Sequence, residues 1–494
     1  MKKYVLGRIL KSLLSIIVVV SIVLVMVYSL IPVSKIFQND TAYKKLQANE
    51  KTVYKYGKLE ELGYLQYYSL SEMCAEKGTD HKACLVAGSE EQQSVLDAFE
   101  SEGYTIELLD KNDSLRGQSI AYRYYNNFQL IFNFFSDLVK VDHPWVIQDA
   151  ANPDLERKYY FGTTPTNGVA LMCSGCDFKY QLYTDTHFPF IHQNMVRLEF
   201  GISYPTLQGL QTSDVIGLGQ GSIEPFEQTF PTGATQTSPI LQNTCRYKTK
   251  LDHLDEAKFD DHYANCQIKY DSPSMVMTSY IFGVISLIIS YAVALPSGIA
   301  MARNKGKLID KIGIVYINLL IAVPSLAFIF FLKYIGMGFG LPDRFPQLGF
   351  GDIRSYILPI IILALLNTPS LMMWIRRYMI DQSNADYVKF AKAKGLSKKE
   401  IFSNHILKNA IIPIVNGIPS SIVLCISGAL ITESVFSIPG MGKMLPDAIK
   451  ASNNNMVITL TFIFTALSVF SVLVGDLLMT VVDPRIQLTA KGDK

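Results

Sequence analysis

Complete catalytic motifs are missing from this sequence. Its 494 residues contain no HExxH zinc motif, no GxSxG nucleophile and no full GxxxxGKS/T phosphate loop. The run Gly440-Met-Gly442-Lys443 lacks the phosphate-loop spacing, and we interpret it as a turn. We therefore predict no enzyme activity, no metal and no cofactor in this chain.

The chain also lacks a strong excess of charge of either sign. Its 45 Lys and Arg residues nearly balance 43 Asp and Glu, which gives a net charge of +2, and we expect no nucleic-acid partner. This average hides two unlike parts. Residues 34–275 hold 21 basic and 32 acidic residues, a net of −11, so the remaining residues sum to +13.

The remaining residues are dominated by apolar runs. Runs of about 20 residues match the roughly 30 Å thickness of the hydrocarbon core of a bilayer. The sequence predicts six membrane spans, at 10–33, 276–302, 312–335, 357–375, 411–432 and 456–482. Basic residues before the first span resemble a signal peptide, but the long apolar run without a cleavage site favours an uncleaved anchor.

Charge predicts the orientation of these spans. Residues 303–311 contain four basic residues and one acidic residue, and residues 376–410 contain eight basic and three acidic residues. The alternate loops, 336–356 and 433–455, each hold two of either sign. Because basic loops stay in the cytoplasm, we expect both termini inside and residues 34–275 outside. That outer part is predicted to mix helices and strands, with helices over 41–63 and 89–103.

Six of the seven cysteines lie in the outer part, where an even number in an oxidising compartment predicts disulfides. The sequence leaves the pairing open, although proximity favours Cys74 with Cys84, Cys173 with Cys176, and Cys245 with Cys266. The alternative for Cys173-Ser-Gly-Cys176 is a redox or metal motif. The remaining cysteine, Cys425, is expected to pack within a span.

Histidines and carboxylates of the outer part form two further groups. His187 and His192 flank an FPFI run, and Asp252–Glu256 lead on to Asp260–His262. Such side chains can bind divalent metals. A solvated acidic face is the simpler interpretation of the second group, and we predict no metal site.

The basic stretch 376–412 contains two helix-start patterns and one helix-stop residue. Ser383 with Asp386, and Ser397 with Glu400, are spaced as capping boxes. Gly395 lies between them, where a left-handed helix stop needs a residue without a side chain. We therefore predict two short helices at a fixed angle on the cytoplasmic side.

This stretch resembles the coupling loop of ABC importer permeases, and in particular the peptide-permease branch. That branch has Y-V-x-x-A-x-A-K-G-L followed by H-x-x-x-N-A-x-x-P, and the matching residues here are Tyr387, Val388, Ala391, Ala393, Lys394, Gly395, Leu396, His405, Asn409, Ala410 and Pro413. Where the general importer pattern has Glu, Ala, Ile and Pro, this chain has Lys389, Phe390, His405 and Lys408. Segments 432–445 and 475–488 also resemble the branch. The likeness covers about 1–35 and 275–490 and is greatest for Gram-positive oligopeptide permeases of the AmiC/OppB type.

The resemblance implies an all-α polytopic membrane protein of the type I ABC importer permease kind. Its six helices would be interrupted by an extracellular α+β domain, giving a first helix in 1–33, an outer domain at 34–275, a permease core at 276–482 and a cytoplasmic tail at 483–494. It also implies a second homologous permease, two cytoplasmic ATPases that bind ATP and Mg, a lipid-anchored peptide-binding protein, and a peptide substrate. The residues implied to couple to the ATPases are Tyr387, Ala391, Ala393, Lys394, Gly395, Leu396, His405 and Asn409.

Polar residues within the predicted spans are candidates for a translocation pathway or for contacts between helices. The candidates for the pathway are Asn318, Ser325, Asn367, Thr368, Asn416 and Ser420. Asp476 and Glu433 are ionisable residues at or near the membrane, where a pairing or functional role is expected. We expect Asp476 to pair with a basic residue at the inner end of the spans.

Two other functions remain open from the sequence. The chain could be a membrane-anchored extracellular receptor or sensor, which would need no ATPase, or an extracellular thiol enzyme that uses Cys173 and Cys176. Within the importer class, dipeptides, opines or nickel are the alternative substrates.

Overall fold

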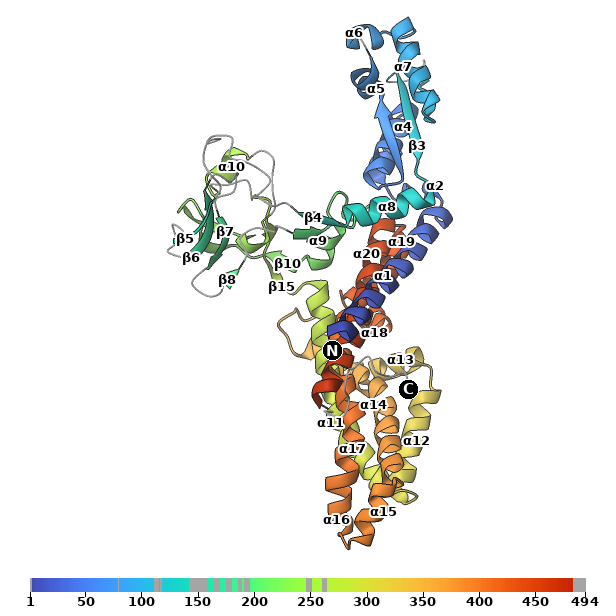
Figure 1. The fold of residues 1–494 in the computed structure, drawn as a ribbon, viewed down its shortest axis with the longest axis vertical. Helices are drawn as coiled ribbons and strands as arrows, with labels where there is room; N and C mark the ends of the chain where they lie inside the picture. Colours follow the sequence, from blue (N-terminus) through green and yellow to red (C-terminus); the bar gives the residue numbers. More distant parts are fainter. Residues whose placement is uncertain are drawn as a thin grey trace. The chain divides into compact units, whose positions relative to one another are not determined.

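The computed structural model describes all residues except 1, 79, 111–114, 116–117, 142–157, 164–168, 175–179, 185–188, 191–195, 246–250, 260–263 and 483–494. The chain divides into two compact units (Figure 1). We call Met1–Leu30 with Ser274–Lys494 the helical unit, and Ile31–Pro273 the inserted unit. His187, His192, Cys176 and Asp260–His262 lie outside the described residues, as does the side chain of Cys173.

The helical unit consists of helices, and its longest connection among the described residues is 339–353. Its elements are α1 (Lys2–Leu30), α11 (Met275–Arg303), α12 (Leu308–Ala322), α13 (Ser325–Gly338), α14 (Arg354–Ser383), α15 (Asp386–Ala393), α16 (Lys398–Glu400), a π-helical segment (Ile401–Leu407), α17 (Lys408–Leu424), a 3-10 turn (Cys425–Ser427), α18 (Leu430–Phe436), α19 (Met441–Ala451) and α20 (Asn454–Val482).

Five helices among the described residues are long and apolar enough to cross a membrane: Leu6–Leu30, Met275–Arg303, Arg354–Ser383, Lys398–Ser427 and Asn454–Asp476. The span expected at 312–335 is instead a pair, α12 and α13, bent by 105°. The bend follows from Pro324, since the residue before a proline is disfavoured in helical geometry, and Val323 is extended with ψ 128°. By length and composition, the described residues thus hold five candidate spans, or six if the bent pair crosses as one.

The inserted unit begins with helices around a three-stranded antiparallel sheet. Its first elements are α2 (Val33–Ile36), α3 (Thr41–Lys45), α4 (Ala48–Glu61), β1 (Leu65–Ser69), α5 (Leu70–Lys77), α6 (His81–Cys84), α7 (Glu90–Ser101), β2 (Thr105–Leu108), β3 (Ser119–Tyr124) and α8 (Asn127–Asp137). The sheet order is β1-β3-β2. The helix expected over 41–63 is two helices, because Gln47 and Glu50 form a capping box that starts α4 anew.

The rest of the inserted unit is mainly strands. These are β4 (Val139–Val141), β5 (Lys158–Thr163), β6 (Val169–Ser174), β7 (Tyr180–Thr184), β8 (Pro189–Phe190), β9 (Val196–Leu198), α9 (Thr212–Gly217), β10 (Gln220–Ile223), β11 (Phe226–Thr229), β12 (Thr235–Ser238), β13 (Ile240–Leu241), α10 (His253–Glu256), β14 (Gln267–Ile268) and β15 (Tyr270–Ser272). They form one four-stranded sheet, β5-β6-β7-β8, and antiparallel pairs that include β4 with β9.

Two disulfides lie within separate cores of the inserted unit. Cys74 and Cys84 are bonded, and both belong to the apolar cluster between α5, α6 and α7. Cys245 and Cys266 are bonded beside Phe230, which is fully buried. Each bridge therefore closes a short loop over its own core. Asp252, from the acidic run considered above, caps α10.

A buried carboxylate joins the start of the inserted unit to a distant loop. Asp40 is 1% exposed and accepts hydrogen bonds from the hydroxyls of Tyr54, at 2.8 Å, and Tyr204. It also caps α3 through the amides of Ala42 and Tyr43. Burial by itself would raise the pKa of Asp40, but these four hydrogen bonds outweigh it and hold that pKa below its usual value.

Candidate functional site

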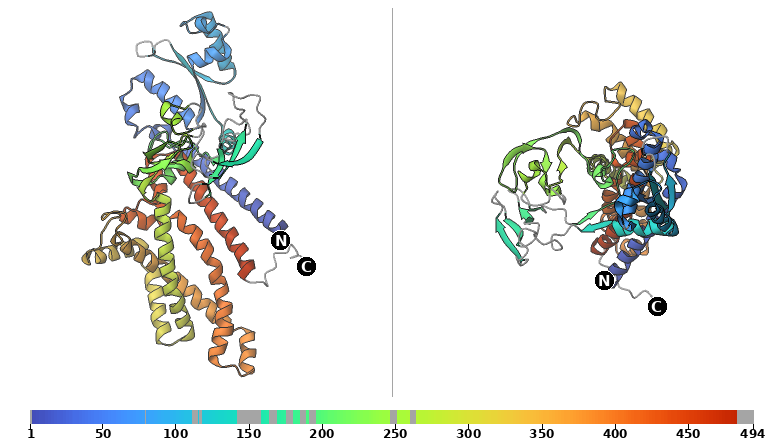
Figure 2. Two further views of the ribbon diagram at one scale, coloured as in Figure 1. Left: turned by 90° about the vertical axis from the view of Figure 1, so that its left-hand side faces the viewer. Right: turned by 90° about the horizontal axis from the view of Figure 1, so that it is seen from above.

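The predicted helix stop at Gly395 is present. Gly395 has φ +78°, and its N–H donates to the carbonyl of Lys392 at 3.0 Å, while Leu396 N–H donates to Ala391 at 3.3 Å. A Cβ added at Gly395 would meet no atom within 4 Å. The position therefore favours glycine because of its backbone angle and not because of crowding. Figures 1 and 2 show α15 and α16 at one end of the helical unit.

The capping box at Ser397 is confirmed, but it does not start a second short helix. Ser397 N–H donates to Glu400 Oε2 at 2.9 Å, and Glu400 N–H donates to Ser397 Oγ at 3.3 Å. The helix that begins here continues through the π-helical segment and α17 to Ser427. The prediction of two separate short helices is thus wrong, because no stop residue follows Glu400. The turn is instead continuous with a long apolar helix.

The other predicted capping box, Ser383 with Asp386, is wrong. Helix α14 runs on through Ser383, whose hydroxyl donates to the carbonyl of Ile380 at 2.7 Å. The residue before α15 is Ala385, which has no capping side chain, and Asp386 pairs with Lys389 at 2.8 Å. The hydroxyl cannot cap α15 while it lies inside the preceding helix.

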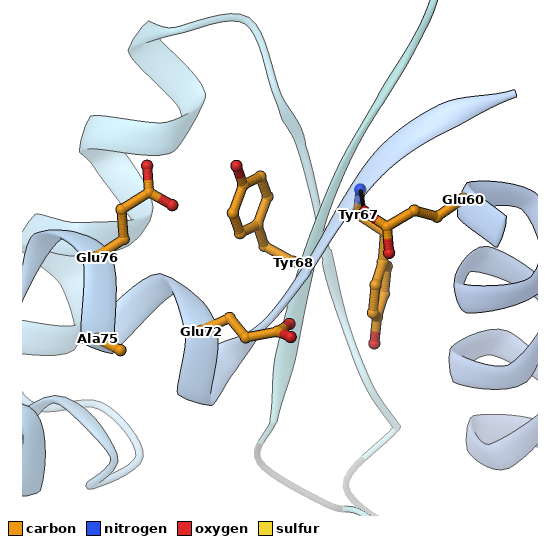
Figure 3. Close-up of a pocket in the computed structure, with 6 residues that line it drawn as sticks. All are labelled: Glu60, Tyr67, Tyr68, Glu72, Ala75 and Glu76. Atoms are coloured by element: carbon orange, nitrogen blue, oxygen red, sulfur yellow. Dashed lines mark hydrogen bonds between the residues drawn. The ribbon is translucent and has the colours of Figure 1, made fainter. Parts of the chain in front are cut away.

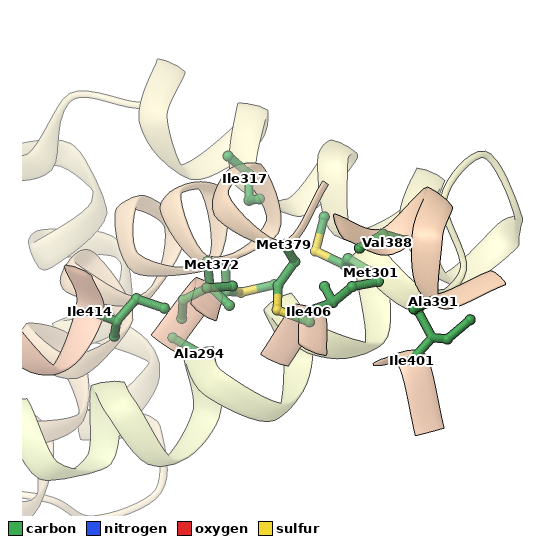
Figure 4. Packing of buried hydrophobic residues seen from close by; sticks show 12 residues of the cluster. Ala294, Met301, Ile317, Met372, Met379, Val388, Ala391, Ile401, Ile406 and Ile414 are labelled. Atoms are coloured by element: carbon green, nitrogen blue, oxygen red, sulfur yellow. The ribbon is translucent and has the colours of Figure 1, made fainter. Parts of the chain in front are cut away.

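Helix α15 has one buried face and one exposed face. Val388 and Ala391 are 1% and 4% exposed and pack in a cluster with Met301, Met379 and Ile401 (Figure 4). The methyl of Ala391 is therefore covered within this chain. The predicted residues Ala393, Lys394, Gly395 and Leu396 are exposed.

An exposed aromatic side chain accompanies them. Phe390 is 69% exposed, because two residues along the helix from the buried Val388 is nearly the opposite face of α15. In the sequence it was notable only as a departure from the general importer pattern. Phe390 and Leu396 are thus exposed apolar side chains in a loop rich in lysine.

The other three predicted coupling residues come together in a groove. Tyr387, His405 and Asn409 line a space of about 610 Å³ with Tyr378, Gln382, Ile412 and Pro413. The Tyr387 hydroxyl donates to Gln382 at 2.7 Å, and its ring centroid is 6.4 Å from that of His405. Gln382 lies outside the residues that match the peptide-permease pattern, so nothing in the sequence pointed to its contact with Tyr387.

A bidentate ion pair braces the helices beside this loop. Arg376 donates from Nε to Asp310 Oδ1 at 2.6 Å and from Nη2 to Oδ2 at 2.9 Å. Asp310 also accepts from Gly306 N–H at 2.8 Å, and its side chain is 2% exposed. The pair fixes the start of α12 against the end of α14, a fork geometry typical of strong Arg–carboxylate pairs. Sequence reasoning missed it, because Asp310 was only the single acid in a basic loop.

Five of the six candidate pathway residues fall into two groups. Asn318, Ser325 and Asn367 are exposed on the surface of the helical unit. Thr368 is buried and donates to its own helix at Ala364, 2.6 Å away, and Ser420 donates to Ser471 of α20 at 2.7 Å.

Asn416 differs from both groups. Its Oδ1 is buried without a hydrogen-bond partner among the described residues. Of the six candidates, only Asn318, Ser325 and Asn367 are thus exposed.

Glu433 organises the segment between α17 and α19. Its carboxylate accepts from Ser279 Oγ at 2.7 Å, Ala429 N–H at 3.0 Å and Lys443 N–H at 2.9 Å. Burial raises the pKa of Glu433, although these hydrogen bonds oppose the rise. The glycine-rich fragment noted in the sequence therefore turns its amides to an internal carboxylate.

Three glycines make room for this carboxylate. A Cβ at Gly428, Gly440 or Gly442 would lie closer than 3.0 Å to an oxygen or the carboxyl carbon of Glu433. The repeated glycines around one acid were the signal in the sequence that could have shown the cluster.

The two end helices of the helical unit are also joined by charge. Arg8 Nη1 lies 3.0 Å from Asp476 Oδ2. Asp476 thus has the basic partner that was expected for it. The segment Asp483–Arg485 lies outside the described residues.

The inserted unit has an acidic pocket of about 440 Å³, lined by Glu60, Tyr67, Tyr68, Glu72, Ala75 and Glu76 (Figure 3). Two of its carboxylates have local structural roles. Glu60 accepts from Tyr67 N–H at 3.2 Å, and Glu72 caps α5 with Ser69. Within the described part of the chain, no three His, Cys, Asp or Glu side chains are placed to hold a metal ion.

Comparison with known proteins identifies the family. Residues 294–488 match the family described as binding-protein-dependent transport system inner membrane component. The chain is 42% identical over 500 aligned residues to the oligopeptide transport system permease protein AmiC of Streptococcus pneumoniae, which covers 100% of both chains. The chain belongs to this permease family. Because the alignment spans the full length, the inserted unit of the permease is part of the shared sequence.

Other relatives match a smaller part of the permease. The dipeptide permease DppB of Lactococcus lactis is 33% identical over 207 residues, covering 42% of this chain and 67% of DppB. Among solved structures, the inward-facing MetNI methionine ABC transporter has a TM-score of 0.34 and 13% identity, covering 42% of this chain and 94% of that chain. That TM-score is too low for a comparison of helix positions.

Proposed function

We propose that the permease is the membrane-spanning subunit of an ATP-driven oligopeptide importer and forms half of its translocation pathway. The observation that carries this proposal is the full-length identity of 42% to AmiC, which is named an oligopeptide permease. Its partners are a second homologous permease, two cytoplasmic ATPases that bind ATP and Mg, and a lipid-anchored peptide-binding protein. ATP is hydrolysed in those separate subunits.

The coupling loop receives movement from the ATPases. Phe390 and Leu396 are exposed, while the other face of α15 packs on the rest of the helical unit through Val388 and Ala391. After Gly395 the chain enters the helix Lys398–Ser427 without a break. A displacement of this turn would therefore move an apolar helix directly, which supports a coupling role for the turn.

The orientation places both termini in the cytoplasm and the inserted unit outside the cell. The basic loops 303–311 and 376–410 support this, because positive residues remain inside. The bonded pairs Cys74–Cys84 and Cys245–Cys266 agree with an oxidising outer compartment. We extend the same proposal to Cys173 and Cys176.

The pathway is lined by polar side chains that face away from the chain's own core. Asn318, Ser325 and Asn367 are exposed although they lie in apolar helices. Such groups are costly against lipid and are accommodated by water or a second subunit. Thr368 and Ser420 already have hydrogen-bond partners and hold helices instead.

The inserted unit receives the peptide-binding protein. Residues 34–275 carry a net charge of −11 and many aromatic residues, a composition that suits a polar protein interface. Binding through charge should weaken as salt screens it. The permease should capture the cognate lipoprotein at low salt and release it at high salt, and no binding at either would contradict this role.

The transport function is tested by uptake into cells that lack the permease. Uptake of labelled oligopeptides should be lost and should return with the wild-type chain. Dipeptide, opine and nickel uptake are measured in parallel, and loss of one of those alone would reassign the substrate. Unchanged uptake of all four would favour the sensor function and overturn the proposal.

A further inference from the structure

A second groove of the helical unit lies between α12 and α14 and has a volume of about 370 Å³. Its lining includes Ile317 and Asn318 from α12, and Met373, Arg376, Arg377 and Asp381 from α14. Residues four apart share one face of a helix, so 373, 377 and 381 form one continuous stripe. The volume is near the lower end of the range for ligand sites, roughly 300–1,000 Å³, and admits the end of a peptide rather than its whole length.

The two arginines of this groove differ in what they can still bind. Arg376 is held by Asp310 through two hydrogen bonds, and its side chain is 24% exposed. Arg377 is 67% exposed, and the one carboxylate within 4.0 Å of it among the described residues is that of Asp381, whose Oδ2 lies 4.0 Å from Nε. That distance is too long for a hydrogen bond, and exposed pairs of this kind contribute little. Arg377 can therefore offer its guanidinium to a ligand.

The lining combines positive charge, an amide and apolar walls. Its two guanidinium groups outnumber the single carboxylate of Asp381, so the lining favours an anion. Asn318 is exposed, and its side-chain amide can both donate and accept a hydrogen bond, as a peptide group requires. Ile317 and Met373 supply apolar surface. A carboxylate, a peptide group and an aliphatic side chain match these three features, and the C-terminal end of a peptide carries all of them.

We propose that this groove binds the C-terminal end of a peptide, with the terminal carboxylate on Arg377 and the adjacent peptide group on Asn318. The inference rests on the proposed function, in which Asn318 lines the pathway, and it adds a contact for one defined part of the substrate. The groove lies between the start of α12 and the end of α14, which adjoin the basic stretches 303–311 and 376–410. A peptide would therefore meet it at the cytoplasmic end of the proposed pathway.

Other anions use the groove less completely. An acyl chain of an anionic lipid would leave the amide of Asn318 without a hydrogen-bond partner in apolar surroundings, which is costly. A phosphate ion would use Arg377 but neither Asn318 nor the apolar walls. A guanidinium also matches a carboxylate well, because both are planar and can form two parallel hydrogen bonds. We therefore assign the groove to a peptide carboxylate and treat lipid and phosphate as outcomes of the test.

Trp374 provides a signal next to the proposed site. The Arg377 guanidinium lies over the Trp374 ring, with its carbon 5.3 Å from the ring centroid. A carboxylate bound to Arg377 should alter this contact and with it the fluorescence of Trp374. The full permease with its co-purifying subunits is placed in phosphatidylcholine nanodiscs without binding protein or nucleotide. The signal of the same complex carrying Trp374→Phe is subtracted, so that the difference belongs to Trp374.

Trialanine is titrated as the free acid and as the C-terminal amide, with inorganic phosphate as a third probe. We expect a saturable change with the free acid, and apparent binding of the amide that is weaker by about tenfold or more, as for loss of a charge-assisted pair. Binding of radiolabelled trialanine is measured for the variants, because a change at Arg377 also alters the fluorescent contact. Arg377→Gln should weaken binding by a similar factor. The matched control Arg354→Gln, at the other end of α14 with a side chain 62% exposed, should bind as the wild type does.

Several results would overturn the proposal. Equal binding of acid and amide, or wild-type binding by Arg377→Gln, would remove the carboxylate from Arg377. An equal response to phosphate would show a general anion site, and loss of trialanine binding in phosphatidylglycerol nanodiscs would assign the groove to lipid. Normal oligopeptide uptake by cells without trialanine binding in nanodiscs would refute this site alone, whereas unchanged uptake in cells that lack the permease would refute the proposed function itself.

Discussion

Substitution of Gly395 should uncouple the permease through its backbone angle alone. At φ +78° a residue with a side chain adopts a left-handed conformation that costs roughly 1–2 kcal/mol relative to right-handed geometry. Nothing lies within 4 Å of the missing Cβ, so no steric cost within the chain adds to this. An energy of 1–2 kcal/mol lowers the population of the native turn by a factor of about 5–30.

The size of the side chain at position 395 then predicts a graded series. Gly395→Asn should be the mildest change, since Asn tolerates this region, and Gly395→Ala should show the full backbone cost. Gly395→Val should be the most severe, because a β-branched residue is a stronger outlier at positive φ. We expect Gly395→Val to abolish transport while membrane insertion stays intact.

The assay compares peptide uptake and ATPase co-purification at equal amounts of permease in the membrane. Gly57→Ala is the matched control, because Gly57 is inside α4 and its added Cβ also meets nothing within 4 Å. That change should leave uptake unchanged. Wild-type uptake by Gly395→Val would refute the coupling role of the turn, and equal losses for Asn, Ala and Val would show that contact with a partner, not backbone strain, sets the requirement.

Further predictions concern the buried polar contacts. Arg376→Ala should clearly lower the unfolding temperature of the solubilised permease, because it leaves Asp310 buried without its partner at a cost of about 3–5 kcal/mol. The control Arg377→Ala, at a side chain that is 67% exposed, should cost no more than about 1 kcal/mol. Equal effects of the two changes would contradict the stabilising role of the Arg376–Asp310 pair. Glu433→Gln should destabilise by about 2 kcal/mol, since an amide presents N–H groups to backbone N–H donors, whereas Ser434→Ala on the same helix should be neutral in the same thermal assay. The pKa of Asp40 is lowered in the folded protein, so its contribution to stability is present above the unfolded value near 3.8 and is lost as the pH falls through the folded pKa. Tyr204→Phe should therefore shift the midpoint of acid unfolding, followed by circular dichroism, to higher pH. An unchanged midpoint would count against the hydrogen bond. Thiol labelling of the unreduced permease should find at most Cys425, and three or more reactive thiols in the inserted unit would revive the redox or metal interpretation.

The sequence by itself determined the features that depend on neighbouring residues. Long apolar runs predicted helices at 276–302, 357–375 and 456–482, and the structure has helices over all three ranges. Gly395 and the box of Ser397 with Glu400 predicted a stop and a start, and both are present. Hydropathy and backbone preference are local properties, so they can be read along the chain without knowledge of the fold.

Only the tertiary structure decided how far helices continue and which polar groups meet. Ser383 has the correct spacing for a cap, but α14 runs through it. The partners Arg376 and Asp310 are 66 residues apart, and Ser279 and Glu433 are 154 apart, distances at which no local pattern links two side chains. The same holds for Ala391, whose burial depends on Met301 and Ile406 from other helices. Burial and ion pairing are set by packing between distant segments, because a charge is stable inside a protein only where the fold supplies its partner.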